Sequence, residues 1–165
     1  MERREFEIVG TSPLMVSCDR LANPLDPLKK ELATYTSKRN KTDDDIEAIY
    51  KLEWEAGLYY NDGKPIMPTN CIKAMIRSAA KLNKLGKNIQ RGVVLIGEEV
   101  PIIYPGPKDR ESMWKSGNFS DIRSCKVKQS KVMRCRPIFN DWSLIFTLAL
   151  NESIMDMKEI VDILI

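Results

Sequence analysis

The chain has 165 residues, 43% of them hydrophobic, and a formal net charge of +3, which is the profile of one globular domain rather than of a disordered segment. It contains no histidine, which excludes Ser-His-Asp and Cys-His nucleophiles and every imidazole general base. No apolar run approaches the length of about 18 residues that a membrane span needs, and the N-terminal residues lack the apolar core of a signal peptide. We therefore expect a cytoplasmic protein without a membrane segment.

The first predicted elements are a strand and a long loop that contains one helix. Acidic and apolar side chains alternate over residues 5–9, which is the period-2 pattern of a half-buried strand. Asn-Pro and Asp-Pro pairs at 23–24 and 26–27 are turn signals. Residues 17–41 are therefore expected to form a loop with a short helix near residues 28–35.

An acidic helix is predicted next. Thr42 has a side chain suited to an N-cap, and three aspartates at 43–45 fill the first turn, where the helix macrodipole favours negative charge. The helix is expected to reach about Ala56 and to end at Gly57. The acidic triplet would also suit a metal ion, but capping and solvation are the commoner reasons for such a run. Together these helices predict a helical insertion over residues 17–60.

A hairpin and a second helix follow. Residues 59–64 contain an Asp-Gly pair typical of a two-residue hairpin turn. Pro68 with Thr69 or Asn70 then opens a helix. Its apolar side is predicted to hold Ile72, Met75, Ile76, Ala79 and Leu82. A basic ridge, within an arc of about 80° on the same helix, is predicted at Lys73, Arg77, Lys81 and Lys84.

The next part of the chain is predicted to be mainly β. Residues 93–96 and 100–104 have the composition of strands, and a loop that carries Trp114 follows them. Residues 121–137 are expected to form a basic β-ribbon with its tip at residues 129–130.

A strand and a helix are predicted to close the sequence. Apolar and small polar residues alternate from Trp142 to Leu150, which predicts a strand with one core face, and Ser153 is expected to cap a last amphipathic helix. The resulting order of strand, helix, two strands and helix is α+β. It is one strand short of the ferredoxin-like βαββαβ unit.

Charge is unevenly distributed along the chain. Residues 64–91 carry seven basic groups and no acidic one, whereas residues 41–55 hold six acids and two bases. Clustered cations are the usual signature of a nucleic-acid-binding surface. A solvated helix face or a charged edge strand that deters aggregation would look similar. On the nucleic-acid interpretation, the binding groups are Thr69, Asn70, Lys73, Arg77, Lys81, Lys84, Lys126, Lys128, Lys131, Arg134 and Arg136.

Four cysteines occur, at Cys18, Cys71, Cys125 and Cys135, and none forms a Cys-x-x-Cys pair. A structural zinc site would need all four, because there is no histidine. We expect reduced and mostly buried thiols, and we expect no cofactor or resident metal.

Residues 64–77 read Lys-Pro-Ile-Met-Pro-Thr-Asn-Cys-Ile-Lys-Ala-Met-Ile-Arg. This segment resembles a signature of the RAMP superfamily, the CRISPR-associated subunits that line guide RNA. The positions that match the family pattern in spacing are Pro68, Ile72, Lys73, Ile76 and Arg77. Residues 132–139 and 22–27 also look like stand-alone versions of this fold carried by bacteriophages.

The resemblance implies a single ferredoxin-like or RRM-like domain over residues 1–165. The family closes with a last strand and a glycine-rich loop, whereas this sequence ends at Ile165, so the resemblance implies a C-terminally short version. The implied activity is non-catalytic binding of the sugar–phosphate backbone of single-stranded RNA or guide RNA. CRISPR effector subunits or further copies of the chain are the implied protein partners.

Two alternatives belong to other functional classes. The first is a phage anti-CRISPR mimic that binds Cas subunits and blocks assembly of the complex. The second is a metal-dependent ribonuclease, because some RNA-targeting members of the superfamily use one aspartate in the loop after the first strand. Asp19 and Asp26 lie in the comparable region and are the catalytic candidates, although Asp26 is also well explained as a turn residue.

Overall fold

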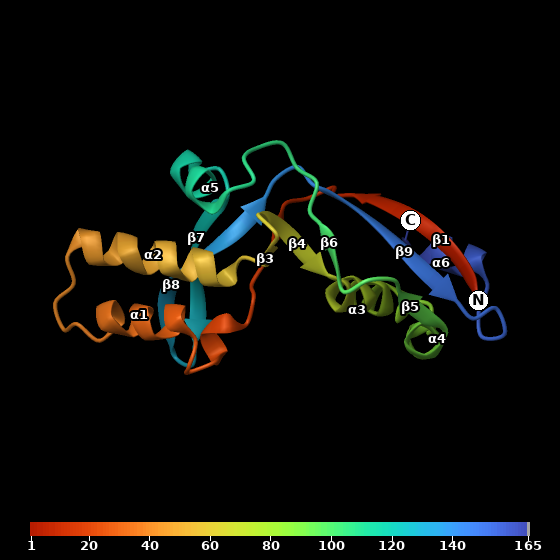
Figure 1. The fold of residues 1–165 in the computed structure, drawn as a ribbon. Helices are drawn as coiled ribbons and strands as arrows, with labels where there is room; N and C mark the ends of the chain where they lie inside the picture. The colour runs from red at the N-terminus through yellow and green to blue at the C-terminus, as the bar shows by residue number, and fades with distance from the viewer. Residues whose placement is uncertain (165) are drawn as a thin grey trace. The chain divides into compact units, whose positions relative to one another are not determined.

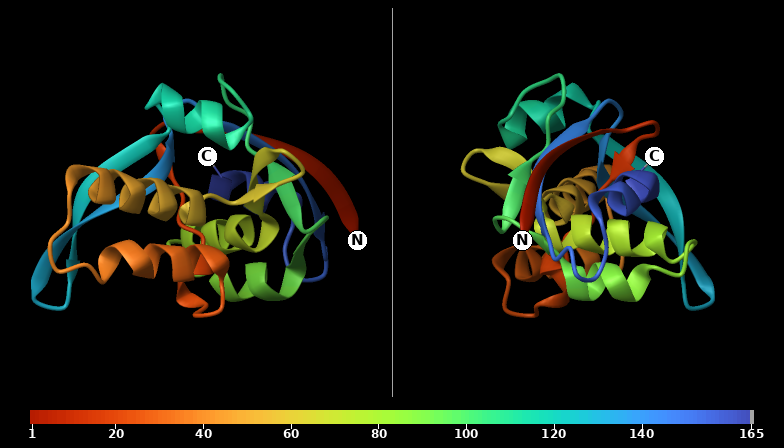
Figure 2. Two further views of the ribbon diagram at one scale, coloured as in Figure 1. Left: turned by 60° about the vertical axis from the view of Figure 1, so that its left-hand side comes forward. Right: turned by 90° about the vertical axis from the view of Figure 1, so that its right-hand side faces the viewer.

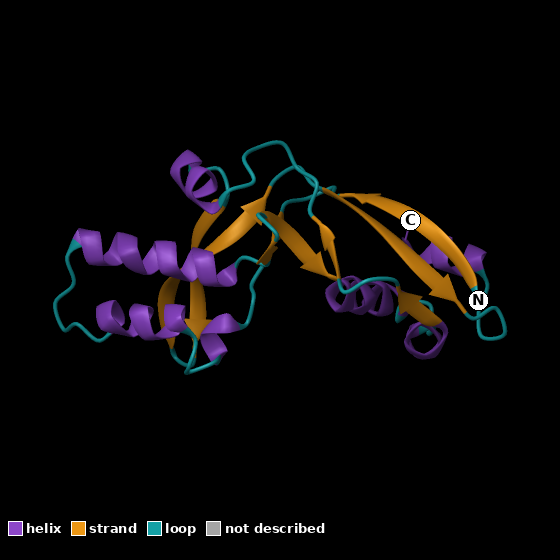
Figure 3. Cartoon of the chain, in the orientation of Figure 1, coloured by secondary structure: helices purple, strands orange, loops and turns teal. Residues whose placement is uncertain are grey.

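The computed structural model describes residues 1–164 (Figure 1). By their contacts these residues group into two compact units, each assembled from segments that are distant in sequence. Unit 1 contains residues 1–9, 66–103 and the described residues from 143 onward, and unit 2 contains residues 10–65 and 104–142. Each unit mixes helices with small antiparallel sheets (Figure 3), so the predicted α+β class is confirmed. The predicted helical insertion and basic ribbon both fall within unit 2.

The central sheet of unit 1 has three antiparallel strands in the order β1-β9-β5. Their bounds are Glu2–Val9 for β1, Ser143–Leu150 for β9 and Val93–Leu95 for β5. The β1–β9 register places Phe6 directly opposite Phe146, and the two rings stack with centroids 6.1 Å apart. The alternation of buried residues along β9 matches the predicted single core face of this strand.

Three helices complete the core of unit 1: α3 (Thr69–Ala80), α4 (Gly86–Gly92) and α6 (Met157–Leu164). The buried stripe of α3 consists of Ile72, Ile76 and Ala80, each at most 2% exposed. The prediction that Met75 and Leu82 belong to this core is wrong, because they are 40% and 88% exposed. The stripe follows strict i, i+4 spacing, and the helix ends before Leu82.

Strand β4 (Lys64–Pro68) is formed by the predicted hairpin. Its first residues pair with β3 (Tyr60–Asn61) in unit 2, across a turn in which Asp62 and Gly63 have φ angles of 47° and 74°. Positive φ at both central positions is the geometry that favours Asp-Gly. In unit 1, the rest of β4 pairs with β6 (Glu99–Pro101).

Unit 2 packs two helices against a β-ribbon. Helices α1 (Pro27–Thr36) and α2 (Asp43–Gly57) run side by side, as Figure 1 and the left view of Figure 2 show. The ribbon consists of β7 (Ser120–Val127) and β8 (Ser130–Phe139), and α2 packs against β8. Strand β2 (Leu14–Met15) pairs with the other side of β8, and the short η1 helix (Arg20–Ala22) precedes α1.

The core of unit 2 is largely aromatic. Trp54 is 1% exposed, and its indole N–H donates a 2.8 Å hydrogen bond to the carbonyl of Phe119. The rings of Tyr104, Phe119 and Phe139 contact one another with centroids 4.9–6.0 Å apart. These contacts join the loop before β7 to the end of β8, and so fix the base of the ribbon.

Three local predictions need correction. The expected loop around Trp114 contains helix α5 (Arg110–Ser116), capped by Asp109 at its start and by Gly117 with φ 69° at its end. The last helix starts at Met157 rather than after Ser153, because Asp156 and Glu159 exchange hydrogen bonds of 2.8 and 2.9 Å as a capping box. The turn of the ribbon lies at residues 128–129, one position before the predicted tip.

No helix within residues 1–164 is both long and apolar enough to cross a membrane.

Candidate functional site

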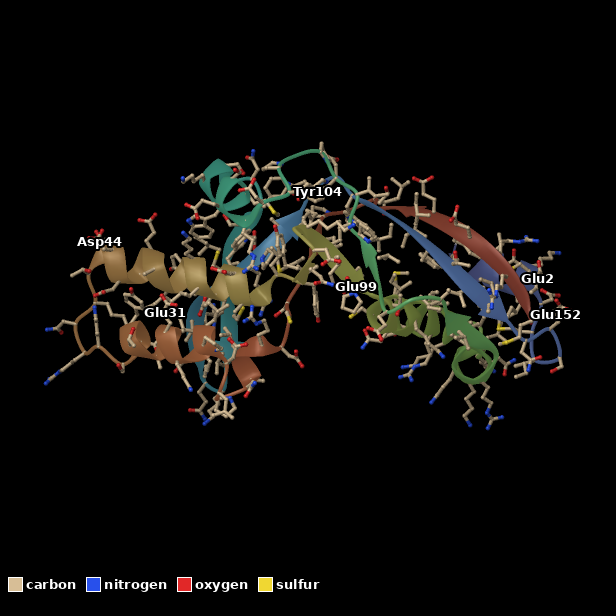
Figure 4. All side chains as sticks on the ribbon, in the orientation of Figure 1. Glu2, Glu31, Asp44, Glu99, Tyr104 and Glu152 are labelled. Carbon is tan, nitrogen blue, oxygen red and sulfur yellow. The ribbon has the colours of Figure 1, made fainter. Side chains whose placement is uncertain are left out.

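The end of α3 and the start of α4 enclose a hollow of about 480 Å³ in unit 1. Four cationic side chains line it, together with Gly86 and Gln90: Arg77, Lys81, Lys84 and Lys87. We call this surface the basic cradle. Figure 4 shows nitrogen-tipped side chains projecting from this α3–α4 segment.

The backbone between the two helices brings these cations together. After α3 ends at Ala80, the chain makes a tight turn in which the N–H of Leu85 donates back to the Ala80 carbonyl at 2.9 Å. Lys84 closes this turn with a φ of 62°, in the left-handed region. A Cβ on Gly86 would lie 3.0 Å from Cγ of Lys81, so glycine permits α4 to start this close to α3.

The charges of the cradle are not neutralised within the protein. None of its four cations forms a salt bridge to a carboxylate among the described residues, and no acidic residue lines the hollow. Arg77 and Lys81 are also four positions apart on one helix face, where like charges repel. Such a surface costs the folded state some stability, and an anionic ligand would relieve that cost.

The structure therefore brings three of the four predicted ridge residues into one site. The fourth, Lys73, lies outside the hollow, and its ammonium donates a 3.4 Å hydrogen bond to the carbonyl of Gln90. This bond ties α3 to α4 near the C-terminal end of α4, where the helix dipole favours a cation. Lys87 was not among the predicted site residues. The sequence feature that could have identified Lys87 is the run of basic residues without an acidic one over residues 64–91.

At the start of α3, the polar groups of Thr69 form hydrogen bonds within the protein. The N–H of Thr69 donates to the carbonyl of Glu98 at 2.9 Å, and its hydroxyl lies 2.9 and 3.0 Å from the carbonyls of Gly97 and Glu98. Thr69 is only 8% exposed, so these groups fasten the turn before β6. Asn70, by contrast, is exposed.

The predicted ribbon residues lie in unit 2 and divide into two sets. Lys126, Arg134 and Arg136 line a hollow of about 400 Å³, the ribbon groove, whose lining also includes Asp19 and Lys29. Lys128 and Lys131 lie outside this lining, at the exposed tip. Lys126 stands directly opposite Lys131 across the ribbon, and such like-charge pairs are destabilising.

One ribbon cation is neutralised internally. Arg134 forms an ion pair with Glu53 of α2, whose second carboxylate oxygen accepts a 3.0 Å hydrogen bond from the N–H of Cys135. Glu53 is 4% exposed. Arg134 therefore attaches the ribbon to α2, which leaves Lys126 and Arg136 as the predicted ribbon cations of the groove that form no salt bridge among the described residues.

The two candidate catalytic aspartates differ in their surroundings. Asp26 accepts hydrogen bonds from Arg20 at 3.0 and 3.3 Å and caps α1 through the N–H of Leu28. The Arg20 hydrogen bond is the main reason that the pKa of Asp26 lies below its ordinary value. Asp19 is exposed in the ribbon groove, beside the thiol of Cys18. Across residues 1–164, no group of three or more Cys, Asp or Glu side chains is arranged to hold a metal ion.

Three of the four cysteines, Cys18, Cys125 and Cys135, also line the ribbon groove, and all four are free thiols. Burial raises the pKa of Cys135 to about 12, so this thiol stays protonated near neutral pH. The prediction that the thiols are mostly buried is wrong, because Cys18, Cys71 and Cys125 are half-buried and only Cys135 is fully buried.

No protein-family model matches the sequence, and no curated protein is significantly similar to it.

Proposed function

We propose that this protein binds single-stranded RNA non-catalytically, along the sugar–phosphate backbone, with the basic cradle as its main contact. One observation carries the proposal: four cations without carboxylate partners converge on one hollow that no acidic residue lines. Backbone phosphates are the ligands that such a surface attracts, and contacts to phosphate position a strand without reading its sequence.

The number of cations favours a polyanion over a single small anion. Four positive charges exceed the charge of one phosphate group, whereas consecutive phosphates of a strand can each neutralise one cation. The cations also come from α3, the turn after it and α4, so they span a surface rather than a point. Within unit 2, Lys126 and Arg136 of the ribbon groove form a separate basic surface.

The exposed face of the unit 1 sheet is not suited to recognise RNA bases. The register places Glu5 and Glu7 of β1 beside Thr147 and Ile145 of β9, and this face has no aromatic residue on which bases could stack. Two acidic side chains and one cation, Arg3, leave this face of β1 net negative, which repels phosphate. The proposed RNA path therefore lies over the helices rather than over the sheet.

The connections of unit 1 support the resemblance to the RAMP superfamily. Helix α3 lies between the first and second strands of the sheet in sequence, and α6 follows the third. Together with the spatial order β1-β9-β5, this arrangement is compatible with the first five elements of a ferredoxin-like βαββαβ unit. A stand-alone relative of the CRISPR backbone subunits is accordingly the family that we propose.

Fluorescence anisotropy with a labelled single-stranded RNA tests the proposal. We expect saturable binding at low salt that is strongly weakened when Arg77, Lys81, Lys84 and Lys87 are all replaced by glutamine. A control with the same change in net charge replaces four exposed cations outside both hollows: Lys30, Arg39, Lys64 and Lys158. An equal loss of RNA affinity in the two variants would show that net charge, and not the cradle, determines binding, and would overturn the proposal. Absence of RNA binding by the unaltered protein would also overturn it.

A further inference from the structure

Unit 2 carries a second surface, with the opposite charge. Two hollows of about 610 and 400 Å³ share Glu47, Trp114 and Lys115 in their linings and therefore adjoin each other. They lie where α2, α5 and the start of β7 meet. We call this surface the acid–aromatic groove. Asp44, labelled in Figure 4, marks its end at the start of α2.

The groove has an apolar floor that is already fixed in place. Ile46 and Ile122 are 37% and 47% exposed, and they line the larger hollow together with the rings of Tyr50 and Trp114. Trp114 packs on the buried Trp54, with ring centroids 5.5 Å apart and planes tilted by 53°. Because Trp54 is itself held by its hydrogen bond to Phe119, the Trp114 ring is presented on a rigid base.

More carboxylates than cationic side chains line the groove. Lys51 and Lys115 both pair with Glu111, at 3.1 and 3.4 Å. Asp43, Asp44 and Glu47 form no salt bridge among the described residues. Four carboxylates and two lysines line the groove, so a net charge of −2 remains beside the half-buried Trp114 ring.

The hydrogen bonds that cap α2 use Asp45, whereas Asp43 and Asp44 lie in the first turn, where the helix dipole favours negative charge, and keep their carboxylates exposed. The N-terminus of α2 is capped by a reciprocal box, in which the Thr42 side chain accepts from the N–H of Asp45 and the Asp45 carboxylate accepts from the N–H of Thr42. Asp45 also pairs with Lys38, which holds the pKa of this carboxyl below its ordinary value. Glu47 lies beyond the first turn, and its side chain faces the groove.

We propose that the acid–aromatic groove docks a segment of another protein that presents an arginine side chain between apolar residues. A guanidinium can stack on an indole face while it donates to a carboxylate, and the flanking apolar residues would cover Ile46 and Ile122. Tryptophan, tyrosine and arginine are enriched among the residues that dominate protein–protein binding energies. The inference does not depend on RNA binding by unit 1.

Unit 2 already uses the same chemistry internally. The guanidinium of Arg110 lies 4.4 Å from the centroid of the Tyr60 ring, and it pairs with Glu55 at 2.6 Å. The acid–aromatic groove offers the corresponding ring and carboxylates, with a better π partner and without an intramolecular cation over Trp114 among the contacts that the structure describes.

NMR of the tryptophan indole N–H signals, with a short peptide as probe, tests the inference without RNA. The probe is acetyl-Leu-Arg-Leu-amide, and its control has glutamine in place of arginine. The indole of Trp142 donates to the carbonyl of Ser12 and lines neither hollow, so its signal serves as the internal reference. We expect the Trp114 signal to shift saturably, with the glutamine peptide at least about tenfold weaker.

Matched variants locate the binding. Glu47→Gln and Asp43→Asn each change an exposed side chain, and we expect each to weaken the arginine peptide several-fold. Glu31→Gln, on the exposed surface of α1, should leave the affinity unchanged. Equal binding of the two peptides, or no shift of Trp114 up to the solubility limit of the probe, would overturn the inference. Self-association that disappears in Glu47→Gln would assign the groove to a second copy and also overturn it.

Discussion

Glu53 of α2 and Arg134 of β8 form an ion pair in which the carboxylate is 4% exposed and the guanidinium 42%. The residues are 81 positions apart in sequence. The same carboxylate accepts the N–H of Cys135, so it joins the helical insertion to the ribbon through both a side chain and the backbone. A buried carboxylate is costly unless its partners are in place, which makes this contact a strong constraint on unit 2.

We expect Glu53→Ala to destabilise the protein by about 1–3 kcal/mol, because it leaves the N–H of Cys135 and the guanidinium of Arg134 without their acceptor. Equilibrium denaturation with urea measures this loss. Glu55→Ala on the same helix is the matched control. The Glu55–Arg110 pair is 28% and 40% exposed, so its loss should cost no more than about 1 kcal/mol. Equal effects of the two substitutions would contradict the assigned role of Glu53.

Thr69→Val separates a structural role at the start of α3 from a role in RNA binding. The valine keeps the shape but removes the hydroxyl that donates to the Gly97 and Glu98 carbonyls. We expect a loss of about 1 kcal/mol in the free energy of unfolding, with no change in RNA affinity. Asn70→Ala, at an exposed position, should leave stability unchanged. Reduced RNA affinity with unchanged stability in Thr69→Val would show that the helix start contacts the ligand.

Lys81→Gln should weaken RNA binding while leaving stability nearly constant. The substitution relieves repulsion with Arg77 but also removes a cation from the end of α3, so we expect the unfolding free energy to change by no more than about 0.5 kcal/mol. RNA affinity should fall several-fold at low salt. Lys158→Gln, on α6 in the same unit, is the control and should bind normally. An unchanged RNA affinity of Lys81→Gln would show that this lysine does not contact the RNA.

The protein should show no change in stability between about pH 5.5 and 7.5, because it has no histidine to titrate there. Below this range stability should fall. Hydrogen bonds from Arg20 to Asp26, from Lys38 to Asp45 and from the Ser112 N–H to Asp109 hold the pKa values of these carboxyls below their ordinary values. A group with a lowered folded-state pKa stabilises the protein above its unfolded pKa, near 4, and loses that contribution as the pH falls further.

Thermal unfolding followed across pH 2–8 measures this profile. The expected result is a flat midpoint above about pH 5.5 and a decline that begins near pH 4. A midpoint that shifts between pH 5.5 and 7.5 would contradict this profile. RNA binding should be equally flat across this range, since lysine and arginine stay charged throughout it.

Local signals in the sequence predicted several elements correctly. The Thr42 cap and acidic first turn identified the start of α2, and Asp62-Gly63 identified the hairpin turn. These predictions held because the deciding interactions lie within four residues of one another. The start of α6 was misplaced because Ser153 and Asp156 are both good caps, and the reciprocal bonds with Glu159 favour the second.

The candidate site was only partly predictable. The helical spacing of Arg77 and Lys81 could be read directly, but the contribution of Lys87 depends on the turn that folds α4 back onto α3. The pairing of Arg134 with Glu53 could not be predicted. It joins the two separate sequence segments of unit 2, and no local pattern in either segment indicates it. The acid–aromatic groove likewise depends on α5, a seven-residue helix with too few residues for a clear period.

The salt dependence of RNA binding tests the central claim most directly. If the cradle contacts four phosphates, the slope of log association constant against log salt concentration should be about −2.8. The variant in which Arg77, Lys81, Lys84 and Lys87 are all glutamine should lose most of this slope, while the charge-matched control should retain it. A slope near zero for the unaltered protein, or the same slope in the cradle variant, would contradict backbone binding at the cradle.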